Sequence, residues 1–134
     1  MANRAPTKTV WPSLNYTDAR AGIRFLVDAF GFEERLVVPG EDDGVVEHAQ
    51  LVWPEGGGVM LGTANREGNE FSQRPTGAAS VYVVTDDPDR LFDRAIAAGA
   101  ELVRELRDED YGSRGFSVRD LEGNIWSFGT YKGE

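Results

Sequence analysis

The chain has 134 residues, of which 40% are hydrophobic, and its formal net charge is −9. This length predicts a single domain, and three Trp, four Tyr and seven Phe residues are enough for an apolar core. The negative charge argues against nucleic acid and anionic membranes as partners, because both require clustered Lys and Arg. The absence of Cys excludes disulfides, thiol nucleophiles and thiolate metal sites. Residues 1–10 contain no long apolar stretch, so we expect no signal peptide, no membrane span and a cytoplasmic location.

The first part of the chain, about residues 10–64, predicts the order strand, helix, strand, strand, strand. The alternating segment Val10–Tyr16 is typical of a strand. Asp18 is a good N-cap for a helix that runs to Phe30 and ends at Gly31. We expect the three further strands at residues 32–38, 45–53 and 59–63, with a glycine turn at 56–58.

The second part, about residues 79–131, repeats this order after a linker at about 65–78, which lacks periodicity. Asp86 opens a helix that Gly99 ends, at the same spacing as in the first part. We expect strands at residues 80–85, 102–106, 115–119 and 125–131, the last two joined by a turn at 120–124. The chain is therefore predicted to be an α+β protein of two βαβββ modules, with one helix covering one face of each sheet.

The ordered set of local motifs resembles the vicinal oxygen chelate superfamily, which includes glyoxalase I, bleomycin-resistance proteins and extradiol dioxygenases. Residues 18–25 (Asp-Ala-Arg-Ala-Gly-Ile-Arg-Phe), followed by Phe-Gly-Phe at 30–32, are similar to the family's first helix and the step after it. Residues 120–126 (Asp-Leu-Glu-Gly-Asn-Ile-Trp) are similar to its final hairpin, with Leu121 in place of Pro. The resemblance implies a glyoxalase/bleomycin-resistance fold with a shared cupped mixed sheet around one cavity. It also implies a homodimer, in which modules can pair across subunits.

The resemblance also names the positions where metal-dependent members hold a divalent ion with His and Glu. Carried over residue by residue, these positions are Trp11, Met60, Ser80 and Ser127. A slip of one residue replaces Ser80 by Ala79, and a slip of two replaces Trp11 by Ser13. None of these side chains is a strong ligand for a divalent metal, so we expect neither a metal nor another cofactor.

His48 is the only histidine of the chain. On a regular strand it shares a face with Val46, Gln50 and Val52, whereas Glu47 points to the opposite face. Its two interpretations are a structural side chain and a general base or ligand contact.

The function that we expect is non-catalytic binding of a small hydrophobic or aromatic molecule, neutral or cationic. Antibiotic sequestration, as in bleomycin-resistance proteins, is the most specific form of this hypothesis. The residues expected to contact the ligand are Trp11, Ser13, His48, Gln50, Met60, Ser80, Tyr82 and Ser127. Trp126 is expected in the core, because alternation places it opposite Ser127. The alternatives are a lyase, isomerase or dioxygenase-type enzyme of the same superfamily, with His48 as base in a metal-free version, and a regulatory ligand sensor.

Overall fold

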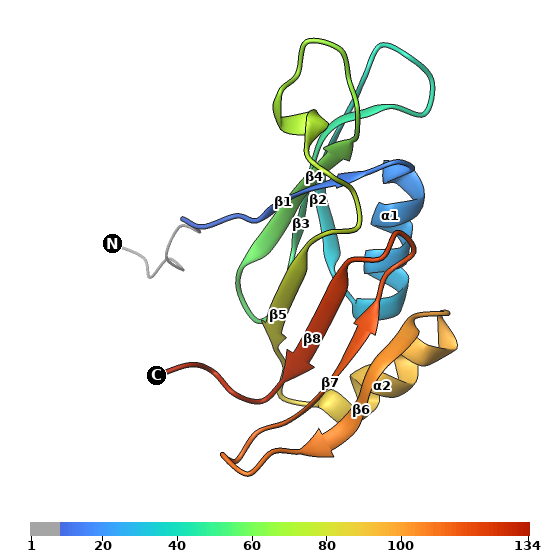
Figure 1. The fold of residues 1–134 in the computed structure, drawn as a ribbon. Coiled ribbons are helices and arrows are strands. Elements are labelled where there is room, and N and C mark those ends of the chain that lie inside the picture. The colour runs from blue at the N-terminus through green and yellow to red at the C-terminus, as the bar shows by residue number, and fades with distance from the viewer. Residues whose placement is uncertain (1–8) are drawn as a thin grey trace.

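The computed structural model describes residues 9–134 and confirms the repeated order of elements (Figure 1). The first module consists of β1 (Ser13–Tyr16), α1 (Ala19–Phe25), the helical turn η1 (Leu26–Phe30), β2 (Glu33–Pro39), β3 (Val46–Val52) and β4 (Gly58–Thr63). The connection contains a single 3₁₀ turn, η2 (Phe71–Gln73). The second module consists of β5 (Ser80–Val84), α2 (Pro88–Ala97), β6 (Glu101–Asp108), β7 (Arg114–Arg119) and β8 (Ile125–Gly129).

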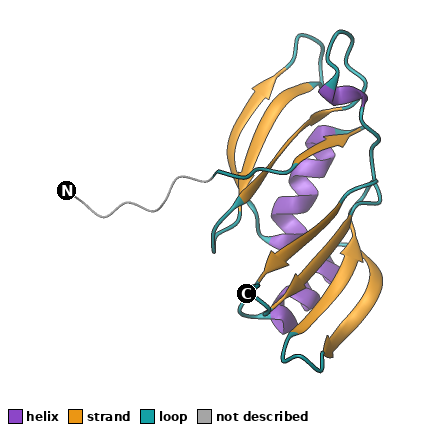
Figure 2. Cartoon of the chain, turned by 60° about the vertical axis from the view of Figure 1, so that its left-hand side comes forward, coloured by secondary structure: helices purple, strands orange, loops and turns teal. Residues whose placement is uncertain are grey.

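Each module forms a four-stranded mixed sheet, and the two sheets have the same topology. The strand orders are β1-β4-β3-β2 and β5-β8-β7-β6. The first strand of each module pairs in parallel with the last strand, and all other neighbours are antiparallel. Strands β1 and β5 are therefore edge strands, and α1 and α2 pack against the sheets of their own modules (Figure 2). This arrangement confirms the predicted α+β fold.

Helix α1 is held at both ends by signals that the sequence shows. The Asp18 side chain accepts a hydrogen bond from the Ala21 amide. Glu122 of the second module completes this cap by accepting hydrogen bonds from the amides of Thr17 and Asp18. The helix continues through η1, which is a π-helical turn, and ends as predicted at Gly31, whose φ of 89° suits glycine. No helix within residues 9–134 is long and apolar enough to cross a membrane.

The helix-covered sides of both sheets share one apolar core. Arg94 of α2 donates hydrogen bonds to the carbonyls of Val27 and Asp28 in η1, which fixes the two helices against each other. Aromatic rings from both modules meet beneath the helices, with centroids 4.8–5.9 Å apart: Phe30, Phe32, Trp53, Trp126 and Phe128. Trp126 is fully buried, as predicted.

The buried carboxylate of Asp120 joins the two modules. It accepts hydrogen bonds from the Tyr16 hydroxyl at 2.6 Å, from Trp126 Nε1 at 3.0 Å and from Asn124 Nδ2 at 3.1 Å. Its second oxygen accepts from the amides of Glu122 and Asn124. Burial and the neighbouring Asp120 charge raise the pKa of Tyr16 far above its usual range.

A second joint between the modules lies where the ends of β3 and β5 meet. Trp53 Nε1, at the end of β3, donates a hydrogen bond of 2.9 Å to the Val84 carbonyl at the end of β5. The modules are therefore tied at the end of β1 by Tyr16 and at the end of β5 by Val84.

Strand β3 departs from the regular alternation that the sequence suggested. Val38 pairs with His48 but Pro39 pairs with Val46, so Glu47 is an extra residue in a β-bulge. Val46 is consequently buried in the core, whereas His48 is half-buried beside Gln50. The prediction that Val46 and His48 share a face was wrong, because one inserted residue reverses the alternation.

We predict that Tyr16→Phe lowers the free energy of unfolding by about 2 kcal/mol, since it removes a hydrogen bond to a buried charge. The pKa of Tyr16 is higher in the folded than in the unfolded state, so only the unfolded state ionises above pH ~10 and stability falls there. The variant should therefore lose less stability than the natural protein between pH 9 and 11. Urea denaturation measures both effects.

The matched control is Tyr111→Phe, which removes the hydroxyl of a tyrosine that is exposed. Equal stabilities of the Tyr16→Phe and Tyr111→Phe variants at pH 7 would contradict the role of the Tyr16–Asp120 joint.

Candidate functional site

The helix-free face of the second sheet carries a row of polar side chains. Tyr82 pairs with Ser127 across β5 and β8, and Ser127 pairs with Ser117 across β8 and β7. The hydroxyl oxygens of Ser117 and Ser127 lie 2.7 Å apart in a hydrogen bond. This row lines a shallow hollow of about 160 Å³.

The helix-free face of the first sheet carries a corresponding row. Ser13 pairs with Met60, and Met60 pairs with Gln50, so the three side chains lie on neighbouring strands at one level. His48 Nε2 lies 3.1 Å from Gln50 Nε2, which makes these two side chains hydrogen-bond partners. The structure thus divides the predicted ligand contacts between the two sheets.

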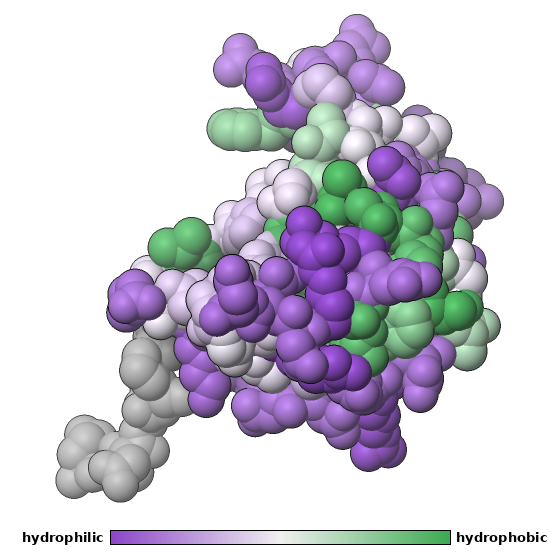
Figure 3. All heavy atoms as spheres, turned by 60° about the horizontal axis from the view of Figure 1, so that its bottom comes forward, coloured by the Kyte–Doolittle hydropathy of each residue, from purple (hydrophilic) through white to green (hydrophobic). Residues whose placement is uncertain are grey.

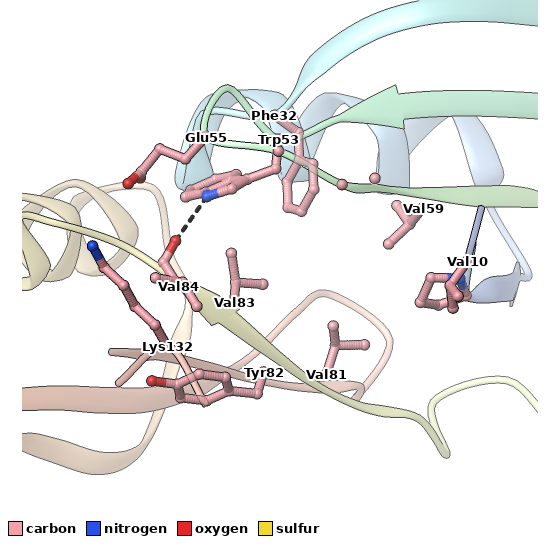
Figure 4. A pocket seen from close by; sticks show the side chains of 14 residues that line it. Val10, Phe32, Trp53, Glu55, Val59, Val81, Tyr82, Val83, Val84 and Lys132 are labelled. Atoms are coloured by element: carbon pink, nitrogen blue, oxygen red, sulfur yellow. Dashed lines mark hydrogen bonds between the residues drawn. The ribbon is translucent and has the colours of Figure 1, made fainter. Parts of the chain in front are cut away.

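A larger cavity of about 520 Å³ lies between the modules, next to the edge of β5. Its floor consists of buried apolar side chains, namely Phe32, Trp53, Val59 and Val83. Val10 and Tyr82 form part of its exposed rim. Figure 4 shows the charged ends of Glu55 and Lys132 at one end of the cavity, and Val10 and Val59 at the other.

Two polar groups at this cavity have altered acidities. Partial burial raises the pKa of Tyr82, whose hydroxyl donates a hydrogen bond of 2.8 Å to the Tyr131 carbonyl. Desolvation and the nearby Asp86 carboxylate raise the pKa of Glu55, and Lys132 opposes this change. The cavity therefore combines an apolar floor with a hydroxyl, a carboxylate and an ammonium group at its rim.

Of the predicted contact residues, Tyr82 lines the larger cavity and Ser127 lines the adjoining hollow. Trp11 packs against Gly58 of the cavity wall, since a Cβ on that glycine would lie 2.8 Å from the indole ring. Ser80 is exposed at the start of β5. The remaining four lie on the first sheet and do not line the cavity: Ser13, His48, Gln50 and Met60.

Sequence reasoning missed the cavity contacts of Phe32, Trp53, Glu55 and Lys132. The one local signal was Trp53, an aromatic residue directly before the Pro-Glu-Gly turn that ends β3. The other three reach the cavity only because the modules pack together, which no local pattern reveals.

The described part of the chain does not bring together the donors that a divalent metal requires. Within residues 9–134, no group of three or more His, Asp and Glu side chains is placed to hold a metal ion. The positions carried over from metal-dependent relatives offer indole, thioether and hydroxyl groups, which are weak ligands for such ions. The residues present therefore do not fit the metal that the fold family implies.

Comparison with known proteins identifies the family. The model of the Glyoxalase/Bleomycin resistance protein/Dioxygenase superfamily matches residues 8–128, and the chain belongs to this superfamily. The uncharacterised protein Mb0911c of Mycobacterium bovis is 32% identical over an alignment of 123 residues, which covers 88% of this chain and 80% of that protein.

Solved structures agree with this assignment. TioX from Micromonospora sp. ML1 is 33% identical, with a TM-score of 0.75 over 90% of this chain and 98% of that one. A glyoxalase/bleomycin resistance protein from Streptomyces sp. CB03234 has the same fold at 20% identity, with a TM-score of 0.63 over 87% of this chain and 94% of that one.

We predict that the protein, dialysed against Zn²⁺, Ni²⁺ and Mn²⁺ and then desalted, retains far less than one metal ion per chain by elemental analysis. The physical reason is the lack of three convergent donors. A control variant, Ser13→His, Met60→His and Gln50→Glu, places three donors on neighbouring strands and should gain metal. Stoichiometric metal in the natural protein would contradict the prediction.

Proposed function

We propose that the protein is a cytoplasmic binding protein for a small hydrophobic or aromatic molecule, which it holds without a metal ion. The observation that carries this proposal is the cavity of about 520 Å³ with its buried apolar floor. Ligand pockets of drug-sized molecules fall in the range of roughly 300–1,000 Å³ and are lined mainly by apolar and aromatic groups. The cavity satisfies both criteria.

The aromatic side chains of the cavity supply the expected binding energy. Trp53 and Phe32 present rings 5.0 Å apart at the floor, and Tyr82, with 49% of its surface exposed, stands at the rim. An aromatic ligand placed between them would exchange water for ring contacts on two sides. The Tyr82 hydroxyl and the paired serines of the adjoining hollow would orient polar groups of the ligand.

Sequestration of an antibiotic is the most specific form of this proposal. It is supported by membership of a superfamily whose name includes bleomycin resistance, and by a cavity that needs no catalytic group to hold its ligand. The ligand would be removed from solution by binding alone.

We also propose a homodimer, supported by the exposed outer strands β2 and β6. Leu36 and Val38 on β2, and Leu102 and Val103 on β6, are apolar side chains with 39–43% of their surface exposed. Figure 3 shows apolar side chains gathered on one part of the molecular surface, bordered by hydrophilic ones.

Analytical ultracentrifugation of the homodimer should give twice the chain mass of 14.7 kDa. Leu36→Glu should shift the measured mass towards that of the monomer, whereas Leu121→Glu, at an exposed turn, should not.

We predict that Tyr82→Ala weakens the binding of the neutral fluorescent probe 1-N-phenylnaphthylamine about tenfold, or about 1.4 kcal/mol. The substitution removes one ring from the rim of the cavity. Probe fluorescence, titrated against protein, measures the dissociation constant.

The control is Phe71→Ala, which removes an aromatic ring that is 80% exposed and outside the cavity. The proposal fails if the natural protein does not bind the probe, or if both variants bind it equally well.

A further inference from the structure

We infer that the ligand of this cavity is peptide-like: it presents amide groups in extended form, which hydrogen-bond to the open edge of β5. This inference rests on the proposed binding function of the cavity and adds the chemical class of the ligand. It is carried by the hydrogen-bond pattern of β5 and by the position of the cavity along that strand.

The main-chain groups of β5 divide between two sides. The Ala79 carbonyl accepts from the Ile125 amide, and the Thr85 amide donates to the Gly129 carbonyl, so odd-numbered residues face β8. Ser80, Tyr82 and Val84 consequently turn their amides and carbonyls to the other side. The hydrogen bond from Trp53 Nε1 to the Val84 carbonyl shows this direction directly.

The cavity follows this open edge. The four consecutive residues 81–84 all line it, although their side chains alternate between the two faces of the sheet. Trp53, which also lines the cavity, binds the outward-facing Val84 carbonyl of this edge strand, so the cavity lies beside the edge of β5. Figure 4 shows β5 crossing the view, with Phe32 and Trp53 on the far side of the cavity from Tyr82.

Tyr82 is at the centre of this edge. Within residues 9–134, no hydrogen bond joins its main-chain amide or carbonyl to another group on the cavity side. A main-chain N–H and C=O beside an apolar surface need hydrogen-bond partners. A ligand with a carbonyl acceptor and an amide donor would pair with the N–H and the C=O of Tyr82 at the same time. A hydrocarbon would leave them unpaired at a cost.

The side chains around the edge suit an extended chain with apolar substituents. Substituents on one side would contact the floor at Phe32, Val59 and Val83. The charged ends of Lys132 and Glu55 stand at one end of the cavity, where the ammonium complements a carbonyl group and the carboxylate complements an amide N–H of the ligand. This mode of recognition is the addition of a strand to a sheet edge.

The test uses the blocked tripeptide N-acetyl-Phe-Val-Phe-amide and three analogues, each N-methylated at one peptide nitrogen. N-methylation removes the hydrogen-bond donor of a peptide nitrogen. Calorimetry should show that methylation of a nitrogen that faces β5 weakens peptide binding at least tenfold, while methylation of a nitrogen that faces away has little effect. In ¹H–¹⁵N spectra, the Tyr82 amide should shift and exchange more slowly on binding. The Val83 amide, which faces β8, is the internal control.

Each alternative has its own result. Equal binding of all analogues, or no change at the Tyr82 amide, overturns the inference. In the absence of peptide, the Tyr82 amide could exchange more slowly as the protein concentration rises. That result would also overturn the inference, because a second copy of the chain would then cover the edge. Binding of 1-N-phenylnaphthylamine without binding of the peptide refutes the ligand class alone, whereas binding of neither refutes the proposed function as well.

Discussion

The structure depends on one buried carboxylate that both modules need. Asp120 lies in the turn before β8, and its charge is tolerated because donors surround it, including the Tyr16 hydroxyl from the other module. Removing that hydroxyl would leave a buried charge with one partner fewer. The end of β1 is therefore fixed against the second module with little freedom. The hydrogen bond from Trp53 to the Val84 carbonyl performs the corresponding task at the end of β5.

The two joints also explain why a cavity exists between the modules. They hold the modules at the ends of β1 and β5, while neither strand hydrogen-bonds to the other. The space that remains is floored by rings of the shared core and bordered by an unpaired strand edge. Trp53 belongs to both features, because its indole nitrogen forms one joint and its ring forms part of the floor. The residue that joins the modules therefore also lines the proposed binding cavity.

Local signals in the sequence were sufficient for the fold but not for the site. Asp18 and Gly31 delimit the first helix, and Pro88 after its Asp cap begins the second, so the repeated order could be predicted. The bulge at Glu47 could not, because it depends on how β3 pairs with β2. The lining of the cavity could be predicted only in part: of the expected ligand contacts, Tyr82 lines it. Lys132, 50 residues away in sequence, reaches it through tertiary packing.

The central claim is that a small molecule binds in the cavity beside β5. The most direct measurement is the response of the three tryptophan indole N–H signals, assigned by substitution, to added 1-N-phenylnaphthylamine in ¹H–¹⁵N spectra. The account predicts a large shift for Trp53, whose ring lines the cavity, and little change for Trp126, which is buried against Asp120. If the probe saturates the protein and the Trp53 signal does not move, the ligand binds elsewhere and the account is contradicted.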